Sequence, residues 1–181
     1  MIYVFLAKGF EEIEALTVVD FLRRAELEVY TVGIGGKIIS GSHNIPVFCD
    51  LDESEVIADE SIDAIVLPGG MPGTLNLEKS ETVQKMIAYC SENNKLVCAI
   101  CAAPSILGHL GLLDGKKACC FPGFENELKG AVIQDGYVSV DSNIITARGM
   151  GAAISFSEAI TAELTDKNKA EKIKNSLQCP F

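Results

Sequence analysis

The chain has 181 residues, 48% of them apolar and 22% charged, a composition that excludes a disordered chain and predicts one globular domain over residues 1–181. A net charge of −10 lacks the basic surface that nucleic-acid binding requires, so we expect no nucleic-acid partner. Apolar runs are far shorter than the roughly 20 residues that span a bilayer, and the first residues lack the basic start of a secretory leader. We therefore expect a cytoplasmic protein with no membrane association.

Short apolar segments alternate along the chain with segments of helical periodicity. Strands are predicted over residues 2–7, 28–33, 64–67, 96–100, 117–120 and 144–147, and helices over residues 11–25, 80–92, 103–110, 151–164 and 167–177. Residues 35–50 indicate a hairpin that turns at Ser42, His43 and Asn44. The alternation predicts an α/β fold whose mostly parallel sheet is covered on both faces and carries its site at the carboxyl edge.

Cys101 lies where a predicted strand runs directly into a predicted helix that begins near Pro104. The small residues Ala99 and Ala103 flank it at two positions before and after, which permits the close backbone approach of a nucleophile elbow. A helix start beneath the sulfur favours the thiolate, so we predict a lowered pKa for this thiol. The alternative is a buried structural cysteine.

The other cysteines suggest neither a redox pair nor a metal site. Cys98 and Cys101 have CxxC spacing, but extended residues three apart place their Cα atoms roughly 10 Å from one another, beyond the approximately 7 Å limit for a disulfide. With only two histidines and no second CxxC, the chain offers no zinc framework, and we expect no metal and no cofactor. Cys119 and Cys120 should face opposite sides of a strand, so one of them could approach the site as a resolving thiol.

Glu14 lies beside the apolar stripe of the first predicted helix, which is formed by Ile13, Leu16, Val19 and Leu22. A carboxyl group in that position should be partly buried, which would raise its pKa and let it donate a hydrogen bond to a thiolate or an oxidised sulfur. The alternative is that the acidic residues of this turn only interact with the positive end of the helix dipole. These residues are Glu11, Glu12 and Glu14.

A glycine turn, PGGMPG, follows the predicted strand over residues 64–67. Its exposed amides could form an oxyanion hole with the amide of Ala102, although such a turn is also ordinary in proteins. His43 and His109 are expected at the surface, and no spacing connects either of them to Cys101.

Four motifs, KGFEEIEA, IVLPGGMPG, AICAAP and ITARGMG, occur in the order and spacing of the ThiJ/PfpI superfamily. Over essentially its whole length the chain resembles the branch of the Parkinsonism-associated protein deglycase. The resemblance implies a flavodoxin-like three-layer sandwich, a homodimer, and an elbow cysteine that is readily oxidised to a sulfinate and hydrogen-bonded to an acid of the first helix. These two residues would be Cys101 and Glu14, with the amides of Gly70 and Ala102 facing the sulfur.

The resemblance also implies a cofactor-free glyoxalase or protein deglycase that acts on methylglyoxal, glyoxal and their early adducts on protein side chains. Chaperone behaviour and protection against oxidative stress accompany this activity in the branch. The alternative is a non-catalytic redox sensor or redox-regulated chaperone that works through oxidation of Cys101. Ala102 replaces the histidine that protease-like members carry there, so we expect no peptidase activity. Phe121 stands where some branch members have a histidine, which would leave Glu14 to handle proton transfers alone.

Overall fold

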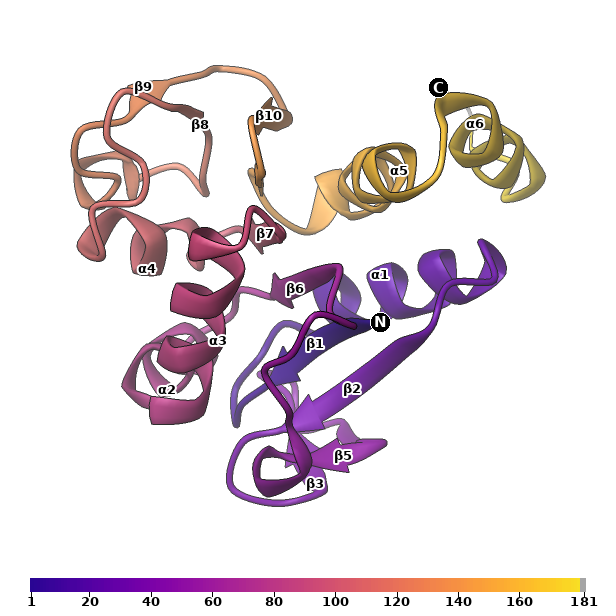
Figure 1. Cartoon of the computed structure of the whole chain (residues 1–181), viewed down its shortest axis with the longest axis vertical. Helices are drawn as coiled ribbons and strands as arrows, with labels where there is room; N and C mark the ends of the chain where they lie inside the picture. Colours follow the sequence, from indigo (N-terminus) through magenta and orange to yellow (C-terminus); the bar gives the residue numbers. More distant parts are fainter. Residues whose placement is uncertain (180–181) are drawn as a thin grey trace.

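The computed structural model, which describes residues 1–179, is built on a seven-stranded sheet (Figure 1). From edge to edge its strands are β10 (Val138–Asp141), β11 (Ile144–Ala147), β7 (Leu96–Ile100), β6 (Ala64–Leu67), β1 (Ile2–Leu6), β2 (Val29–Gly33) and β5 (Leu51–Asp52). Within this sheet only β10 is antiparallel to its neighbour. The predicted α/β class and mostly parallel sheet are confirmed.

Helices cover both faces of the sheet, because its strands bury apolar side chains on each side. One face packs against α1 (Glu12–Arg24) and α5 (Ala153–Leu164), with α6 (Lys167–Ser176) lying on α5. The other face packs against α2 (Gly73–Lys79), α3 (Glu81–Glu92) and α4 (Pro104–His109). Short 3-10 turns are η1 (Glu53–Glu55), η2 (Glu125–Glu127) and η3 (Met150–Ala152). Within residues 1–179, no helix has the length and apolar character needed to cross a membrane.

The central strand β1 shows how the sequence produces this three-layer arrangement. All five of its residues are buried, and successive side chains point to opposite faces. Val4 packs with the α1 and α5 layer, whereas Phe5 packs with the α2, α3 and α4 layer. A continuous apolar strand is therefore the pattern that a sheet covered on both sides requires.

The predicted hairpin is present as β3 (Ile38–Ser40) and β4 (Pro46–Phe48), paired with one another but separate from the main sheet. Its turn contains Asn44 with a φ of +62°. The hairpin is joined to the loop after β1 by two backbone hydrogen bonds, from Gly9 N–H to the carbonyl of Ser40 at 2.9 Å and from Ser42 N–H to the carbonyl of Phe10 at 2.8 Å. These bonds place the hairpin turn beside the start of α1.

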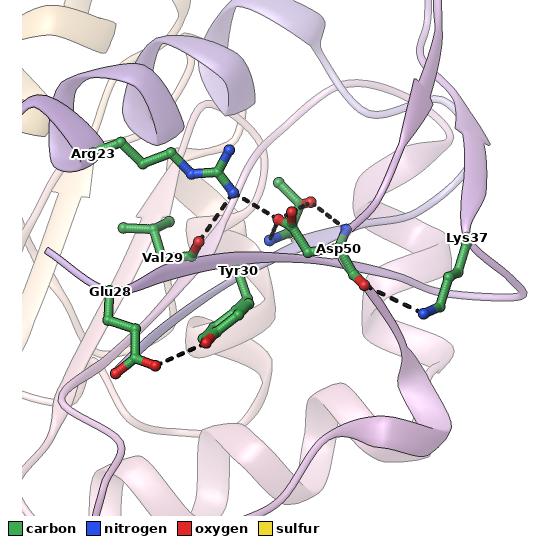
Figure 2. Close-up of polar contacts among 7 residues, drawn as sticks. Arg23, Glu28, Val29, Tyr30, Lys37 and Asp50 are labelled. Atoms are coloured by element: carbon green, nitrogen blue, oxygen red, sulfur yellow. Dashed lines mark hydrogen bonds and ion pairs between the residues drawn. The ribbon is translucent and has the colours of Figure 1, made fainter.

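Asp50 fixes the chain where it returns from the hairpin (Figure 2). Its Oδ2 accepts hydrogen bonds from Arg23 Nη2 at 2.7 Å, from Thr31 N–H at 2.8 Å and from the Thr31 hydroxyl at 2.7 Å. Its backbone carbonyl accepts a bond from Lys37 Nζ at 3.3 Å. Partial burial raises the pKa of Asp50, but the bonds from Thr31 and Arg23 outweigh burial and hold that pKa below its ordinary value.

Most predicted elements agree with the structure to within two residues, but the strand predicted over residues 117–120 is half as long as expected and lies outside the main sheet. Its strand β8 ends at Ala118 and pairs with β9 (Val132–Ile133) in a separate small sheet. The Cys119 N–H instead donates to the hydroxyl of Thr146 at 2.9 Å, so strand pairing stops there. The sequence also gave no prediction of α2, β5, β9 and β10, which are short or form an edge of a sheet.

The predicted apolar stripe of α1 is only half right. Val19 and Leu22 are buried, but Ile13 is 49% exposed and Leu16 is 36% exposed. The buried face passes through Glu14 instead. An acidic side chain therefore occupies a core-facing position at the start of this helix.

Candidate active site

Cys101 lies in the turn between β7 and α4, at the carboxyl edge of the sheet. Its φ of +66° falls in the left-handed region, which residues other than glycine rarely adopt and which costs on the order of 1–3 kcal/mol. Neighbouring backbone imposes this conformation: Cys101 N–H donates to the carbonyl of Ala147 at 2.9 Å, and Phe121 N–H donates to the carbonyl of Cys101 at 2.8 Å. The strained turn between strand and helix matches the predicted nucleophile elbow.

Glu14 projects from the first turn of α1 towards this cysteine. The residue is 1% exposed, so its burial is deeper than the partial burial that the sequence predicted. Its Oε2 accepts a hydrogen bond from Gly69 N–H at 2.9 Å, and its carboxyl group is also hydrogen-bonded to the Cys101 thiol. A Cβ atom at Gly69 would lie 2.5 Å from Cys101 Cβ and 2.7 Å from Glu14 Oε2. Glycine at this position is therefore what permits the contact between acid and thiol.

The two ionisable groups of this contact both hold their protons more tightly than usual. Burial raises the pKa of Glu14 to about 7, and its hydrogen bonds from Cys101 and Gly69 only partly oppose this. Burial, together with the neighbouring Glu14, raises the pKa of Cys101 to about 12. The predicted low pKa of this thiol is wrong, because burial outweighs the effect of the short helix α4. At neutral pH the sulfur is a thiol whose proton Glu14 is placed to accept.

Two backbone amides contact the sulfur. Gly70 and Ala102 both donate hydrogen bonds towards Cys101 Sγ, which favours its charged form. Gly70 has a φ of +88°, and a Cβ atom there would lie 2.4 Å from the backbone nitrogen of Glu11. The turn after β6 therefore depends on glycine to aim this amide at the thiol.

A cavity of about 250 Å³ lies beside the thiol and is large enough for a small carbonyl compound. Its walls come from the loop after β1, the first turn of α1, the hairpin, the turns after β6 and β7, and the segments that follow β8 and β11. The lining residues are Glu11, Glu14, His43, Gly70, Cys101, Phe121 and Met150. A larger surface cavity of about 430 Å³ between α5 and α6 has no cysteine or histidine in its walls, so the smaller one is the better candidate for chemistry.

A second acid–base pair, Glu12 and His43, adjoins this cavity and was not predicted. Glu12 is buried; its Oε1 accepts a hydrogen bond from His43 N–H at 2.8 Å, and its Oε2 lies 2.9 Å from His43 Nδ1. Burial alone would raise the pKa of Glu12, but hydrogen bonds from His43 and Ser42 outweigh it and lower that pKa to about 2. His43 is at the surface as expected, with 68% of its side chain exposed, yet it lines the same cavity as Cys101. No spacing in the sequence connects His43 to Cys101, and the fold is what brings the two residues to one cavity.

Neither Cys119 nor Cys120 lines the cavity, because both are buried in the segment that leaves β8. The Cys119 sulfur lies 3.4 Å from the carbonyl of Thr146, and Cys120 packs in the core beneath α4. These positions do not support the resolving-thiol role that the sequence left open for one of them. Within the described residues the seven cysteines form no disulfide.

The group of side chains in residues 1–179 that could hold a metal ion is Glu11, Glu12 and His43, whose ligand atoms lie within 4.8 Å of one another. These side chains already bond to one another or to the hydroxyl of Ser42. Both carboxylates thus already have hydrogen-bond partners without a cation, and we assign no metal to this group. His109, the other histidine, lies elsewhere on the surface between the carboxylates of Glu78 and Glu127.

The sequence and the structure of the chain are both similar to those of known proteins. Residues 1–163 match the profile of the DJ-1/PfpI family. Protein DJ-1 homolog B of Arabidopsis thaliana is 34% identical over 175 residues, which are 95% of this chain and 40% of that protein. Deglycase PfpI of Pyrococcus furiosus is 33% identical over 150 residues, covering 80% of this chain and 87% of that protein. The structure of oxidized Toxoplasma gondii DJ-1 matches with a TM-score of 0.94 and 34% identity, over 99% of this chain and 98% of that one.

Proposed function

Because the chain belongs to the DJ-1/PfpI family, we propose that it is a cofactor-free glyoxalase or protein deglycase for methylglyoxal, glyoxal and their early adducts on protein side chains. The observation that carries this proposal is the hydrogen bond between the Cys101 thiol and the buried carboxyl group of Glu14, beside a small cavity. A thiol, an adjacent base and two amides are what addition to a carbonyl group requires. The name of the Pyrococcus furiosus relative supports the deglycase activity.

The proposed reaction begins when Glu14 accepts the thiol proton and the sulfur attacks the aldehyde carbon of methylglyoxal. The carbonyl π electrons move to the oxygen, which faces the amides of Gly70 and Ala102 and then receives the proton from Glu14. In the resulting hemithioacetal, Glu14 transfers the hydrogen of carbon 1 to carbon 2, the hydroxyl proton on carbon 1 passes to the oxygen on carbon 2, and a thioester forms. Water hydrolyses the thioester to lactate and restores the thiol, so the sum is methylglyoxal plus water giving lactate.

The test is lactate formation from methylglyoxal by the purified protein and its variants. Cys101→Ser should abolish turnover, and Glu14→Gln should lower kcat by about 10²-fold or more, because it removes the base. Cys179→Ser is the matched control, since Cys179 is the other partly exposed cysteine. Equal rates for the wild type and Cys101→Ser would reject the proposed function.

A redox role for Cys101 is the second candidate, favoured by the raised pKa of Glu14. A protonated Glu14 can donate a hydrogen bond to an oxidised sulfur, and the Toxoplasma gondii relative has a solved oxidized form. In this role peroxide oxidises the thiol to a sulfinate, and the change alters chaperone activity or partner binding during oxidative stress. Mild peroxide followed by intact mass and peptide mapping should then show two oxygens on Cys101 first. Oxidation of other cysteines while Cys101 stays reduced would reject it.

The assembly proposed for this function is a cytoplasmic homodimer of one domain over residues 1–181, the last two of which lie outside the described residues. The exposed apolar side chains of Ile13 and Leu16 on α1 support a self-association surface near the site. Light scattering on the wild type and on Ile13→Glu tests this, because a charge at the centre of such a surface should produce monomers. A wild-type monomer at micromolar concentration would reject the dimer.

A further inference from the structure

His43 is the only basic side chain among the described residues that line the Cys101 cavity. The other ionisable groups in its walls are Glu11, Glu14 and the thiol itself, and Phe121 and Met150 contribute apolar surface. An acid–base reaction on a carbonyl compound needs a proton donor as well as a base. Glu14 supplies the base, so His43 is the group available as the donor.

The buried carboxylate of Glu12 orients the imidazole of His43 through its Nδ1. Glu12 lies 2.9 Å from Nδ1 and also accepts the backbone N–H of the same residue at 2.8 Å, which fixes both the ring and the turn that carries it. Because Glu12 is ionised at neutral pH, Nδ1 carries a proton. Within residues 1–179, Nε2 of this cavity-lining residue has no hydrogen-bond partner, so it can donate when the ring is charged and accept when the ring is neutral. A carboxylate orients a catalytic imidazole in the same way in other enzymes.

The hairpin is shaped to hold this pair. A Cβ atom at Gly41 would lie 2.3 Å from Glu12 Oε1, so glycine lets the hairpin backbone close over the buried carboxylate. The Ser42 hydroxyl lies 3.1 Å from Glu12 Oε2 and 3.0 Å from Glu11 Oε2 and can donate its one proton to either, which connects the turn to the start of α1. The position of His43 is thus set by buried contacts, although its ring is exposed.

We propose that His43 is a catalytic residue that exchanges protons with the substrate oxygens, oriented by Glu12; this rests on the glyoxalase function proposed above. When Glu14 removes the hydrogen of the hemithioacetal at carbon 1, its electron pair forms the double bond to carbon 2. The carbonyl oxygen on carbon 2 takes the proton of His43 Nε2. Glu14 then protonates carbon 2, and His43 recovers a proton from the oxygen on carbon 1 as the thioester forms. Each group ends in its starting state.

The charges around His43 suit this role. Its hydrogen bond with Glu12, followed by the charges of Glu11 and Glu12, raises the pKa of the ring, whereas burial opposes this weakly. Glu14 and the Cys101 thiol complete the set of ionisable groups that line the cavity with it. A raised pKa keeps a larger share of the ring in the donor form at neutral pH.

The experiment compares lactate formation by the wild type, His43→Gln and His109→Gln across pH. His109→Gln is the matched control because it removes the only other histidine of the chain, which does not line the cavity. His43→Gln should lower kcat about 10²-fold with KM nearly unchanged, and should remove the loss of activity that the wild type shows as pH rises through the pKa of His43. Glutamine keeps a donor for Glu12, so the hairpin remains closed.

A second measurement does not depend on turnover. In Glu14→Gln the thiol proton passes to water, so the hemithioacetal with methylglyoxal forms slowly; it should still accumulate at high methylglyoxal, because nothing removes the hydrogen of carbon 1. The His43 ring signal in proton NMR should shift on adduct formation while that of His109 does not. An adduct without any shift of the His43 signal would overturn the inference. Equal kcat and pH profiles for His43→Gln and an active wild type would overturn it while leaving the glyoxalase function intact. An inactive wild type that forms no adduct would reject both.

Discussion

Replacing Glu14 with glutamine should lower the activity of the protein and raise its stability. Glu14 is almost fully buried, and burial raises its pKa from an ordinary 4.5 to about 7. Between these two values the folded chain binds more protons than the unfolded chain, so the free energy of unfolding falls as pH rises through this window. Above about pH 7 the full cost of burying the carboxylate is present, and below pH 4.5 it is absent.

The size of this cost follows from the shift. A difference of about 2.5 pKa units at about 1.36 kcal/mol each gives roughly 3 kcal/mol at pH 8 and about 1 kcal/mol at pH 5. Glutamine has no charge to desolvate, and its carbonyl oxygen can still accept the bond from Gly69 N–H. The free energy of unfolding of Glu14→Gln should therefore exceed that of the wild type by about 2 kcal/mol more at pH 8 than at pH 5. The Cys101 thiol, with a pKa of about 12, stays protonated in the folded chain at both values.

Urea unfolding under reducing conditions at pH 5 and pH 8 measures this difference. The free energy of unfolding falls by about 1–3 kcal/mol per molar urea, so the urea midpoints of the wild type and Glu14→Gln should differ more at pH 8 than at pH 5, by on the order of 1 M. The same preparations should be assayed for lactate formation, which should fall by about 10²-fold. If the urea midpoints of the wild type and Glu14→Gln differ by the same amount at both pH values, burial of the Glu14 carboxyl group does not destabilise the fold.

Three further changes test other contacts of the site and its support. Gly69→Ala should abolish turnover and cost about 1–3 kcal/mol in urea unfolding, because its Cβ would lie 2.5 Å from Cys101 Cβ; an active variant would show that the acid and thiol need not touch. Asp50→Asn should cost about 1 kcal/mol at pH 7, and since the pKa of Asp50 is lowered, the difference should vanish as pH falls through that pKa; a difference independent of pH would refute the charged contact. In the double variant, Phe121→His should restore part of the kcat that His43→Gln loses, because both positions line the cavity. No recovery would show that the imidazole must stand at position 43.

The sequence predicted those parts of the site that depend on neighbouring residues. The elbow at Cys101 follows from a strand, a turn and a helix within one short segment, and the glycine turn at Gly70 follows another strand directly. Parallel strands then bring both turns to one edge, which makes their proximity predictable. The family motifs supplied Glu14 as the partner, which local patterns left open.

The parts that the sequence missed depend on how distant segments close over one another. The pKa of Cys101 is set by burial, and no local pattern shows how much of the thiol the surrounding loops cover. The Glu12 and His43 pair forms only because the hairpin folds back onto the start of α1. The glycine at position 41, beside a turn that contains a histidine, was the one available signal for it.

The distribution of the cysteines links the chemical lifetime of the protein to its folding equilibrium. Five of the seven thiols are buried, and only those of Cys101 and Cys179 are partly exposed. Each unfolding event presents all seven to oxidants and to the thiols of other chains. A loss of 1–2 kcal/mol raises the unfolded fraction about 5–30-fold, and irreversible crosslinking of the core cysteines should rise with it. Variants that destabilise the fold would therefore lose active protein faster under oxidising conditions, even where their catalytic residues are intact.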